Sequence, residues 1–206
     1  YFEEDGFEHE DDRAGGAEVE NRDIISHNEA IAVYGQLNWQ TTEALELILG
    51  ARYTEDKREA FKDSINFENG PQSGSDSWSN FNPGVTANYQ WTDADDAYQL
   101  SSYAKIVTGY KSGGYNVRST EEGFQPPFDE EQMISYELGW KSTFWNQRLR
   151  FNGAIFRAEY DDMQIQQIIN NQQIFLTDVF NAGQAEINGF EFDVSVMPLT
   201  GLSINI

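Results

Sequence analysis

The stretch Phe81–Trp91, FNPGVTANYQW, alternates apolar and polar residues along its whole length. Successive side chains of a β-strand point to opposite faces, so this pattern predicts a strand with one apolar and one polar face. The apolar face would carry Phe81, Pro83, Val85, Ala87, Tyr89 and Trp91, and the polar face Asn82, Gly84, Thr86, Asn88 and Gln90.

The same alternation recurs along the chain, and no segment of comparable length shows a helical period. It is found in IAVYGQLNW (31–39), LELILGARY (45–53), YELGWKSTF (136–144) and FEFDVSV (190–196). In LRFNGAIFRAEY (149–160) the alternation slips at Ile155–Phe156, which indicates a β-bulge. We therefore expect Phe190, Phe192 and Val194 to share the outer face with Val85, Ala87 and Tyr89, and Glu191 and Asp193 to share the inner face with Asn88 and Gln90.

The connections between these segments alternate between short and long. Short turn-forming connections are expected at 40–44, 92–97, 146–148 and 198–201, and long polar loops at 60–77, 112–130 and 163–173. The strands between them run for about ten residues or more, whereas about five or six is usual in globular proteins. One end of the sheet should therefore have tight turns and the other long loops.

Tryptophan stands immediately before three of the short turns. Trp39, Trp91 and Trp145 follow one another at spacings of 52 and 54 residues. The indole ring is apolar but its N–H needs a polar partner, so tryptophan suits a membrane interface. We predict an aromatic girdle of Trp39, Trp91 and Trp145, with Tyr53 and Tyr110 at the other limit of the apolar face. Tryptophans that cap a soluble core are the alternative.

Three fold classes contain repeated strands of this kind. A β-propeller repeats at a similar spacing, but its blades contain four short strands, not two long ones. A soluble carbohydrate-binding β-sandwich would alternate similarly without needing long loops at one end only. An antiparallel up-and-down transmembrane β-barrel accounts for the strand length, the alternation and the loop asymmetry together.

The charge of the chain is strongly acidic. Thirteen basic and 35 acidic residues among 206 give a net charge of −22, which argues against a nucleic-acid partner. Seven carboxylates lie in the first twelve residues, so we expect residues 1–27 to be a polar loop or tail that leads into a barrel domain at 28–206. Capture of a hard cation by Glu8, His9, Glu10, Asp11 and Asp12 is the alternative.

Three features of the sequence concern disulfide bonds, membrane-spanning helices and the start of the chain. There is no cysteine, which excludes disulfides and thiolate metal sites. No apolar run reaches the roughly 18 residues that a membrane-spanning helix needs. The chain begins at YFEED without a signal peptide, so we expect an internal fragment of a longer protein.

The order of these segments resembles the barrel of TonB-dependent outer-membrane receptors. The pieces most similar to that family are GYKSGGYN (109–116), SYELGWKSTFWNQRLRFNGAIF (135–156) and NAGQAEINGFEFD (181–193). The resemblance implies a 22-stranded barrel with an N-terminal plug, in the outer membrane of a Gram-negative bacterium. It also implies uptake of a ferric siderophore, cobalamin or a carbohydrate, with energy from the inner-membrane TonB complex. Nothing here resembles the plug, and we count about seven strands and the start of an eighth.

No pattern in the sequence requires catalysis or a cofactor. In a phosphate-binding loop the glycines precede Lys-Ser/Thr and a helix follows, whereas here Lys111-Ser112 precede Gly113-Gly114 and a loop follows. A G-x-S-x-G nucleophile motif is absent, and His9 and His27 are too sparse for a transition-metal site. We therefore predict that the protein is not an enzyme.

Binding of a small ligand is the chemistry we expect, at the mouth formed by inward side chains and long loops. Arginine and lysine would hold an anionic ligand, and tyrosine would stack on an aromatic or sugar face. For any single residue, pairing across the lumen is the competing role. The candidates are Arg52, Tyr103, Lys105, Lys111, Tyr115, Asn116 and Arg118. The partners expected are this ligand, outer-membrane lipid and, through the plug, the TonB complex; a passive porin-like barrel is the alternative function.

Overall fold

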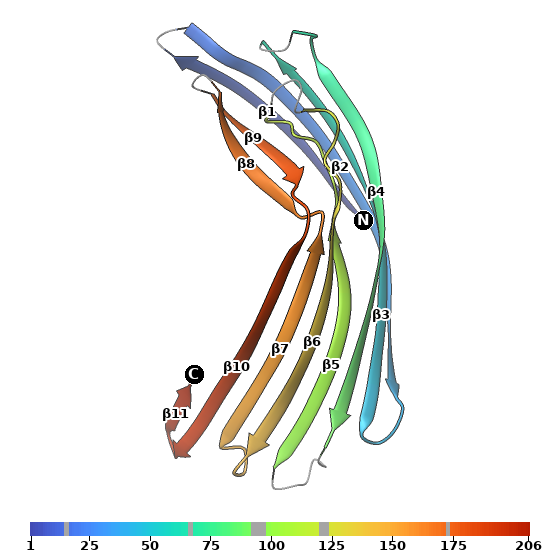
Figure 1. Cartoon of the computed structure of the whole chain (residues 1–206), viewed down its shortest axis with the longest axis vertical. Coiled ribbons are helices and arrows are strands. Elements are labelled where there is room, and N and C mark those ends of the chain that lie inside the picture. The colour runs from blue at the N-terminus through green and yellow to red at the C-terminus, as the bar shows by residue number, and fades with distance from the viewer. Residues whose placement is uncertain (15–16, 66–67, 92–97, 120–123, 172–173) are drawn as a thin grey trace.

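A computed structural model of the chain describes residues 1–14, 17–65, 68–91, 98–119, 124–171 and 174–206. Those residues form a tall, curved, open β-sheet of long strands (Figure 1). No helix in this part of the chain combines the length and hydropathy that crossing a membrane requires.

The main sheet has nine antiparallel strands in the order β1-β2-β3-β4-β5-β6-β7-β10-β11, and β8 and β9 form a separate hairpin. The strand bounds are β1 Phe2–Ala14, β2 Ala17–Gln40, β3 Leu45–Ser64, β4 Gln72–Gln90, β5 Gln99–Lys111, β6 Glu131–Phe144, β7 Leu149–Asp161, β8 Gln164–Asn171, β9 Ile174–Asn181, β10 Ala185–Leu199 and β11 Leu202–Asn205. This single up-and-down sheet confirms the antiparallel fold class and excludes the sandwich, which needs two sheets packed face to face.

The strand register divides the lower half of the sheet into an apolar and a polar face. Residues directly opposite one another in an antiparallel pair share a face. One cross-strand row is Ala87–Ala104–Leu138–Ile155–Phe190, and the row beside it is Asn88–Tyr103–Gly139–Ala154–Glu191. The expected grouping of outer and inner residues is therefore confirmed by the register.

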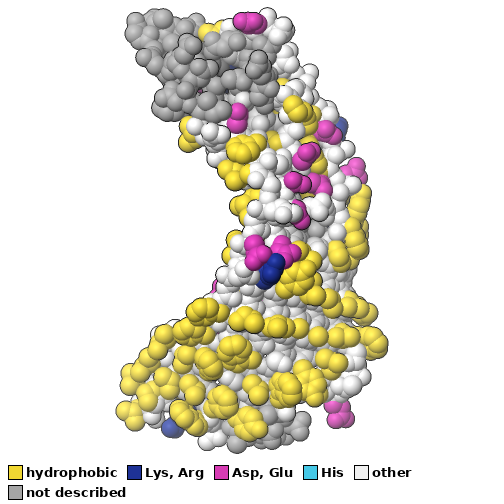
Figure 2. All heavy atoms as spheres, in the orientation of Figure 1, with side chains coloured by type: hydrophobic (Ala, Val, Ile, Leu, Met, Phe, Trp, Pro, Cys, Tyr) yellow, Lys and Arg dark blue, Asp and Glu magenta, His cyan; other side chains and the backbone are white. Residues whose placement is uncertain are grey.

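The apolar face, here called the outer face, is not covered by any other described part of the chain. Val33 is 68 % exposed, Ile155 53 % and Phe190 74 %. Figure 2 shows hydrophobic side chains as a broad patch over the lower half of the molecule, with acidic side chains above it. Exposure of such a large contiguous apolar surface marks a contact with another apolar phase or partner.

Burial is concentrated on the opposite, inner face of the upper half. Lys62, Ser119 and Phe124 are the largest fully buried side chains among the described residues. The segment after β5 folds over β3 and β4 there, and the Lys62 ammonium donates a hydrogen bond to the carbonyl of Ser119. The compact part of the chain therefore lies above the apolar patch.

The acidic N-terminal region differs from the predicted loop or tail, because Phe2–Ala14 form β1 and the residues from Ala17 onward form the first part of β2. Polar side chains connect the two strands: His9 Nδ1 lies 2.7 Å from Asp23 Oδ1, and Arg22 forms an ion pair with Glu10. Opposite charges that face each other across two paired strands stabilise the pairing. Because neither face of this hairpin is apolar, its strands do not show the alternation of apolar and polar residues. The sequence pattern therefore gave no sign of this hairpin.

Two of the three predicted loops also contain strands. Residues 60–77 extend β3 to Ser64 and start β4 at Gln72, and residues 163–173 include β8. The described parts of the third loop, residues 112–119 and 124–130, contain no strand, as predicted, apart from an isolated bridge between Gly114 and Phe128. The predicted count of about seven strands was too low for this reason.

The predicted bulge at Ile155–Phe156 is wrong, because β7 pairs with both neighbours in continuous register. Ile155 lies on the outer face and Phe156 on the inner face. The Phe156 ring lies over Gly189, where a Cβ would be 2.4 Å from the ring. Because Gly189 has no side chain, it leaves room for the apolar ring of Phe156 on the polar inner face.

Candidate ligand-binding site

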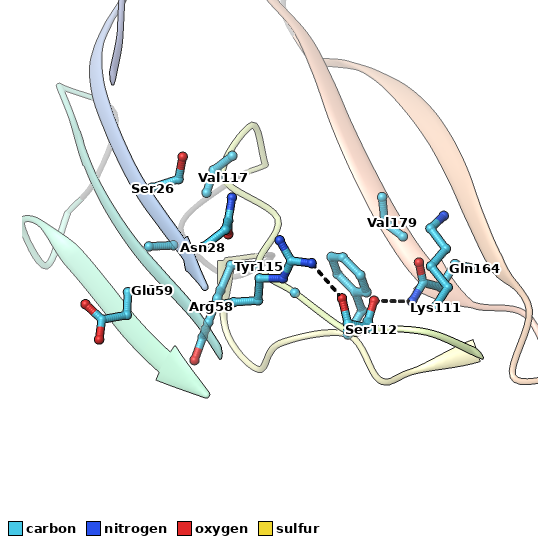
Figure 3. Close-up of a pocket in the computed structure, with 14 residues that line it drawn as sticks. Ser26, Asn28, Arg58, Glu59, Lys111, Ser112, Tyr115, Val117, Gln164 and Val179 are labelled. Atoms are coloured by element: carbon cyan, nitrogen blue, oxygen red, sulfur yellow. Dashed lines mark hydrogen bonds between the residues drawn. The ribbon is translucent and has the colours of Figure 1, made fainter. Parts of the chain in front are cut away.

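A cavity of about 420 Å³ lies in the upper half of the molecule, between β2–β3 and the segment that follows β5 (Figure 3). Its walls come from four parts of the chain that are distant in sequence. The lining residues are Ser26, Asn28, Arg58, Glu59, Ala60, Lys111, Ser112, Gly113, Gly114, Tyr115, Val117, Phe128, Gln164 and Val179. The volume is within the lower range of small-molecule sites.

Two glycines let the segment after β5 approach the inner face. A Cβ on Gly113 would lie 2.3 Å from the carbonyl oxygen of Phe128 and 2.5 Å from the Trp78 ring. A Cβ on Gly114 would lie 2.9 Å from the Phe128 ring. The GYKSGGYN stretch therefore ends strand β5 and starts the close packing that forms one wall of the cavity.

Arg58 is the best-anchored cation at the cavity. Its Nη2 donates to the Ser112 hydroxyl at 2.9 Å and lies 3.3 Å from Asp56 Oδ1. Asp56 also accepts a hydrogen bond from the Tyr110 hydroxyl. The guanidinium of Arg58 is thus held next to the residue that follows β5. Its Nε and Nη1 groups donate to no residue that the structure describes.

Tyr115 and Asn116 hold the segment in place. The Tyr115 ring stacks on Phe124 with centroids 5.5 Å apart, and burial raises the pKa of its phenol, which stays protonated at neutral pH. The Asn116 side chain donates to the Val179 carbonyl at 2.9 Å and accepts from the Val179 amide at 2.7 Å. Asn116 therefore connects the β8–β9 hairpin to the cavity wall.

The sequence-predicted ligand residues do not converge on one site. Lys111 and Tyr115 line the cavity, whereas Asn116 binds backbone. Arg118 contacts Glu8 at 2.6 Å. Of the predicted ligand residues in the upper half, Lys111 and Tyr115 are therefore the two that line the cavity.

The remaining predicted residues lie lower on the inner face. Tyr103 donates to Glu137 at 2.6 Å, and Lys105 lies 3.8 Å from the same carboxylate. Arg52 donates to Thr54 at 3.0 Å and lines a second, shallower cavity of about 450 Å³. Pairing within the inner face accounts for Tyr103 and Lys105.

Arg58, Ser112 and Gln164 were missed by sequence reasoning. Arg58 lies between the predicted strand at 45–53 and the predicted loop at 60–77, yet it is an even-numbered residue of β3, like Arg52. Continuing the inner-face alternation from Arg52 through Thr54 and Asp56 would have found it. Ser112 and Gln164 meet through the Gln164 amide and the Ser112 carbonyl at 2.9 Å, a contact between segments that no local pattern indicates.

The aromatic residues expected at the membrane interface lie at the limits of the apolar patch. Trp39, Trp91 and Trp145 are 55 %, 60 % and 67 % exposed at the end with short turns. The Trp91 indole N–H donates to the Ser102 hydroxyl at 2.9 Å. Tyr53 lies near the upper limit on the outer face, and Tyr110 shares the outer-face alternation of Ala104 and Ile106 in β5, with its hydroxyl donating to Asp56.

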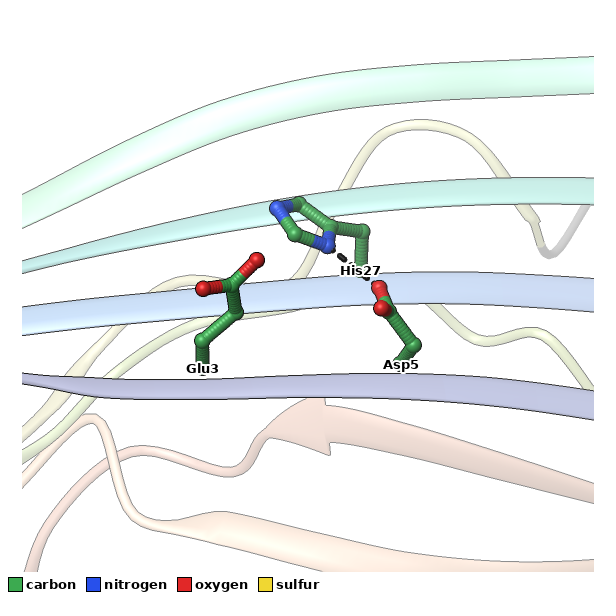
Figure 4. A group of neighbouring side chains, drawn as sticks. All are labelled: Glu3, Asp5 and His27. Atoms are coloured by element: carbon green, nitrogen blue, oxygen red, sulfur yellow. Dashed lines mark hydrogen bonds and ion pairs between the residues drawn. The ribbon is translucent and has the colours of Figure 1, made fainter.

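Glu3, Asp5 and His27 form a group of metal-ligand type on the outer face of β1 and β2 (Figure 4). Their ligand atoms lie within 4.8 Å of one another. The His27 Nδ1 is 2.5 Å from Asp5 Oδ1, and this hydrogen bond raises the pKa of His27 above its ordinary value. Mutual pairing explains the group.

The predicted cation cluster at Glu8–Asp12 does not form as expected. In β1, residues 8 and 10 alternate with 9 and 11 across the strand, so the cluster is divided between two faces. The side chain of Asp12 lies outside the described residues.

Taken together, a long-stranded antiparallel sheet, an apolar outer face bordered by tryptophan and a polar inner face define a wall segment of a transmembrane β-barrel. The family model of the TonB-dependent receptor-like β-barrel matches residues 4–205. The chain belongs to this family of receptors, whose members are not enzymes.

Relatives and solved structures similar to this chain include receptors named for pesticin and for siderophores. The pesticin receptors of Yersinia enterocolitica and Yersinia pestis are 26 % identical over 166 residues, which cover 80 % of this chain and 23 % of theirs. The ferric yersiniabactin uptake receptor from Yersinia pestis superposes with a TM-score of 0.76 at 24 % identity, over 94 % of this chain and 28 % of that one.

A more distant match is the siderophore receptor PiuA from Acinetobacter baumannii, with a TM-score of 0.57 at 19 % identity over 88 % of this chain and 24 % of that one. The chain spans about a quarter of the length of these relatives.

Proposed function

We propose that the chain is part of an outer-membrane receptor of a Gram-negative bacterium that binds a ferric siderophore and imports it with energy from the TonB complex. The family match over residues 4–205 carries this proposal. Two further observations support it: relatives are named as receptors for pesticin or for ferric yersiniabactin, and a cavity lies on the inner face above the apolar patch.

The arrangement of the two faces fits this role physically. Side chains such as Leu49, Val85 and Ile106 form an outer surface suited to hydrocarbon. Every strand needs a hydrogen-bonded neighbour on both sides within a bilayer, so the edge of β2 below Ala30 and the edge strand β11 should pair with further strands in the complete protein. The inner face then lines a lumen, and the cavity opens at its outer mouth.

Uptake measurements test the proposal directly. The complete protein is produced in cells that lack their own siderophore receptors, and entry of radiolabelled iron is followed from a panel of iron(III) chelates. Uptake of at least one chelate is expected, and removal of TonB should abolish it. Uptake that continues unchanged without TonB would instead indicate a passive porin-like barrel.

Cobalamin and carbohydrate remain the other ligand classes of this family to be measured in the same cells. Radiolabelled cobalamin or maltodextrin entering in place of iron would contradict the siderophore assignment. Tyr115 is stacked on Phe124 and so does not offer an open platform for a sugar ring. This feature disfavours a carbohydrate ligand.

A further inference from the structure

The chain contains three Asn-Gly dipeptides, and the fold places them in different surroundings. They are Asn69–Gly70, Asn152–Gly153 and Asn188–Gly189. Because glycine has no side chain, its backbone nitrogen can closely approach the side-chain amide carbon of the preceding asparagine. That approach is the first step of deamidation, so the surroundings of each dipeptide decide how readily it reacts.

The dipeptide Asn152–Gly153 is held inside the main sheet. It lies in β7, which pairs with β6 on one side and β10 on the other. A Cβ on Gly153 would lie 2.4 Å from the Trp140 ring, so this ring covers the glycine. The Asn152 amide donates to Asp193 Oδ2 at 2.7 Å, across to β10. Attack by the Gly153 nitrogen therefore requires the ladder to open locally and the ring to move.

The dipeptide Asn188–Gly189 is also extended and covered. It lies in β10, opposite Arg157 and Phe156 of β7. A Cβ on Gly189 would lie 2.4 Å from the Phe156 ring, and the Asn188 amide donates to Glu186 Oε1 at 2.5 Å. In an extended strand the asparagine side chain points away from the sheet and not toward the next peptide nitrogen. The strand conformation and the ring therefore oppose the reaction here as well.

The dipeptide Asn69–Gly70 is outside the sheet, in the turn that joins the upper ends of β3 and β4 (Figure 1). Asn69 is exposed. Gly70 has a φ of 80°, and a Cβ placed on it would meet no atom within 4 Å. Rearrangement of an exposed turn costs little free energy compared with opening a ladder in the middle of a sheet. The two reacting atoms can therefore meet without displacing a ring or breaking a strand pair.

We propose that Asn69 is a site of spontaneous deamidation and that the fold protects Asn152 and Asn188. The Gly70 nitrogen loses its proton to water or hydroxide and bonds to Cγ of Asn69, and the side-chain nitrogen leaves as ammonia. Water then opens the cyclic imide at either carbonyl, which gives aspartate or isoaspartate. Both products place a new carboxylate at the long-loop end of a chain whose net charge is already −22.

Mass spectrometry of the complete protein in detergent tests the proposal. The folded protein is kept at mildly alkaline pH, sampled over time and digested, and the conversion of each asparagine is followed by peptide fragmentation that separates aspartate from isoaspartate. Asn69 should convert at least about tenfold faster than Asn152 and Asn188, because local opening limits the other two sites. Asn69→Gln should remove the modification at position 69, since the longer side chain must close a larger ring, and should leave the other two rates unchanged.

The unfolded chain provides the matched control. In denaturant the three dipeptides lose their different surroundings and should convert at rates within about threefold of one another. Equal rates at the three sites in the folded protein would overturn the proposal. A preference for Asn69 that persisted in denaturant would also overturn it, because the neighbouring residues and not the fold would then set the rates. Neither result bears on which ligand the receptor imports.

Discussion

Replacing Leu49 by arginine places a charge at the centre of the outer face. Leu49 pairs with Leu37 on β2 and Val85 on β4, and all three side chains point away from the inner face. If this surface contacts lipid hydrocarbon, the guanidinium must be buried in the bilayer or drag water into it. The free energy of unfolding should then fall substantially.

The depth of Leu49 sets the magnitude. The apolar residues of β3 run from Leu45 to Tyr53, and Leu49 is midway between them. Eight residue steps of about 3.3 Å along a strand tilted by about 40° span roughly 20 Å of the bilayer, close to the expected apolar band. Arginine near the midplane of such a barrel costs about 2–4 kcal/mol, a change of roughly 30- to 900-fold in the unfolding equilibrium.

The measurement is denaturant unfolding of the complete protein refolded into phospholipid vesicles. Ile48→Arg is the matched control, because Ile48 is the adjacent residue on the inner face, between Asn38 and Thr86. Its cost should be below about 1 kcal/mol, since an arginine on a polar, hydrated face remains solvated. Equal costs for the two variants, or a larger cost for Ile48→Arg, would refute the assignment of the outer face to lipid.

Two further predictions concern packing and pH. In Gly139→Ala the new methyl group would lie 2.4 Å from the Tyr103 ring, so we expect the free energy of unfolding to fall by about 1–3 kcal/mol in the same assay. Gly35→Ala, with no atom within 4 Å of the new methyl group, should not destabilise the protein. Equal effects of the two substitutions would contradict the packing argument. The Asp5 hydrogen bond raises the pKa of His27 above 6.5, so the contact stabilises β1–β2 pairing below pH 6.5 and is lost as the pH rises through the raised value. An NMR titration of the His27 ring should give a midpoint above 6.5 that falls in Asp5→Asn, and a midpoint at or below 6.5 in the unmodified protein would be inconsistent with the contact.

The sheet could be predicted from the sequence where one face must be apolar. From Ile31 to Trp39 and from Leu45 to Tyr53, alternation fixed both the strands and their orientation, because a slip of one residue would move the whole apolar set to the inner face. Above this level both faces are polar, and alternation gives no signal. The strand extensions from Glu55 to Ser64 and the hairpin of β1 were missed for that reason.

The candidate site was predicted only in part because it depends on contacts between distant segments. The strand end at Lys111 and the close approach allowed by Gly113 could be anticipated from GYKSGGYN. The bonds from Asn116 to Val179 and from Gln164 to Ser112 join residues more than 50 positions apart. No sequence periodicity indicates such pairs. The sequence alone therefore does not distinguish a residue that contacts a ligand from one that hydrogen-bonds to another part of the chain.

The continuity of β3 connects the two halves of the molecule. The same alternation that directs Tyr53 outward, at the limit of the apolar patch, directs Arg58 inward, to the cavity. Apolar contact below therefore fixes the register of a polar segment that could not specify its own register. A one-residue insertion between Tyr53 and Asp56 would leave the lower half in register but turn Arg58 to the outer face, and Ser112 would lose its hydrogen bond from the guanidinium. The face on which Arg58 lies is thus set by hydrophobic residues several positions away along the same strand.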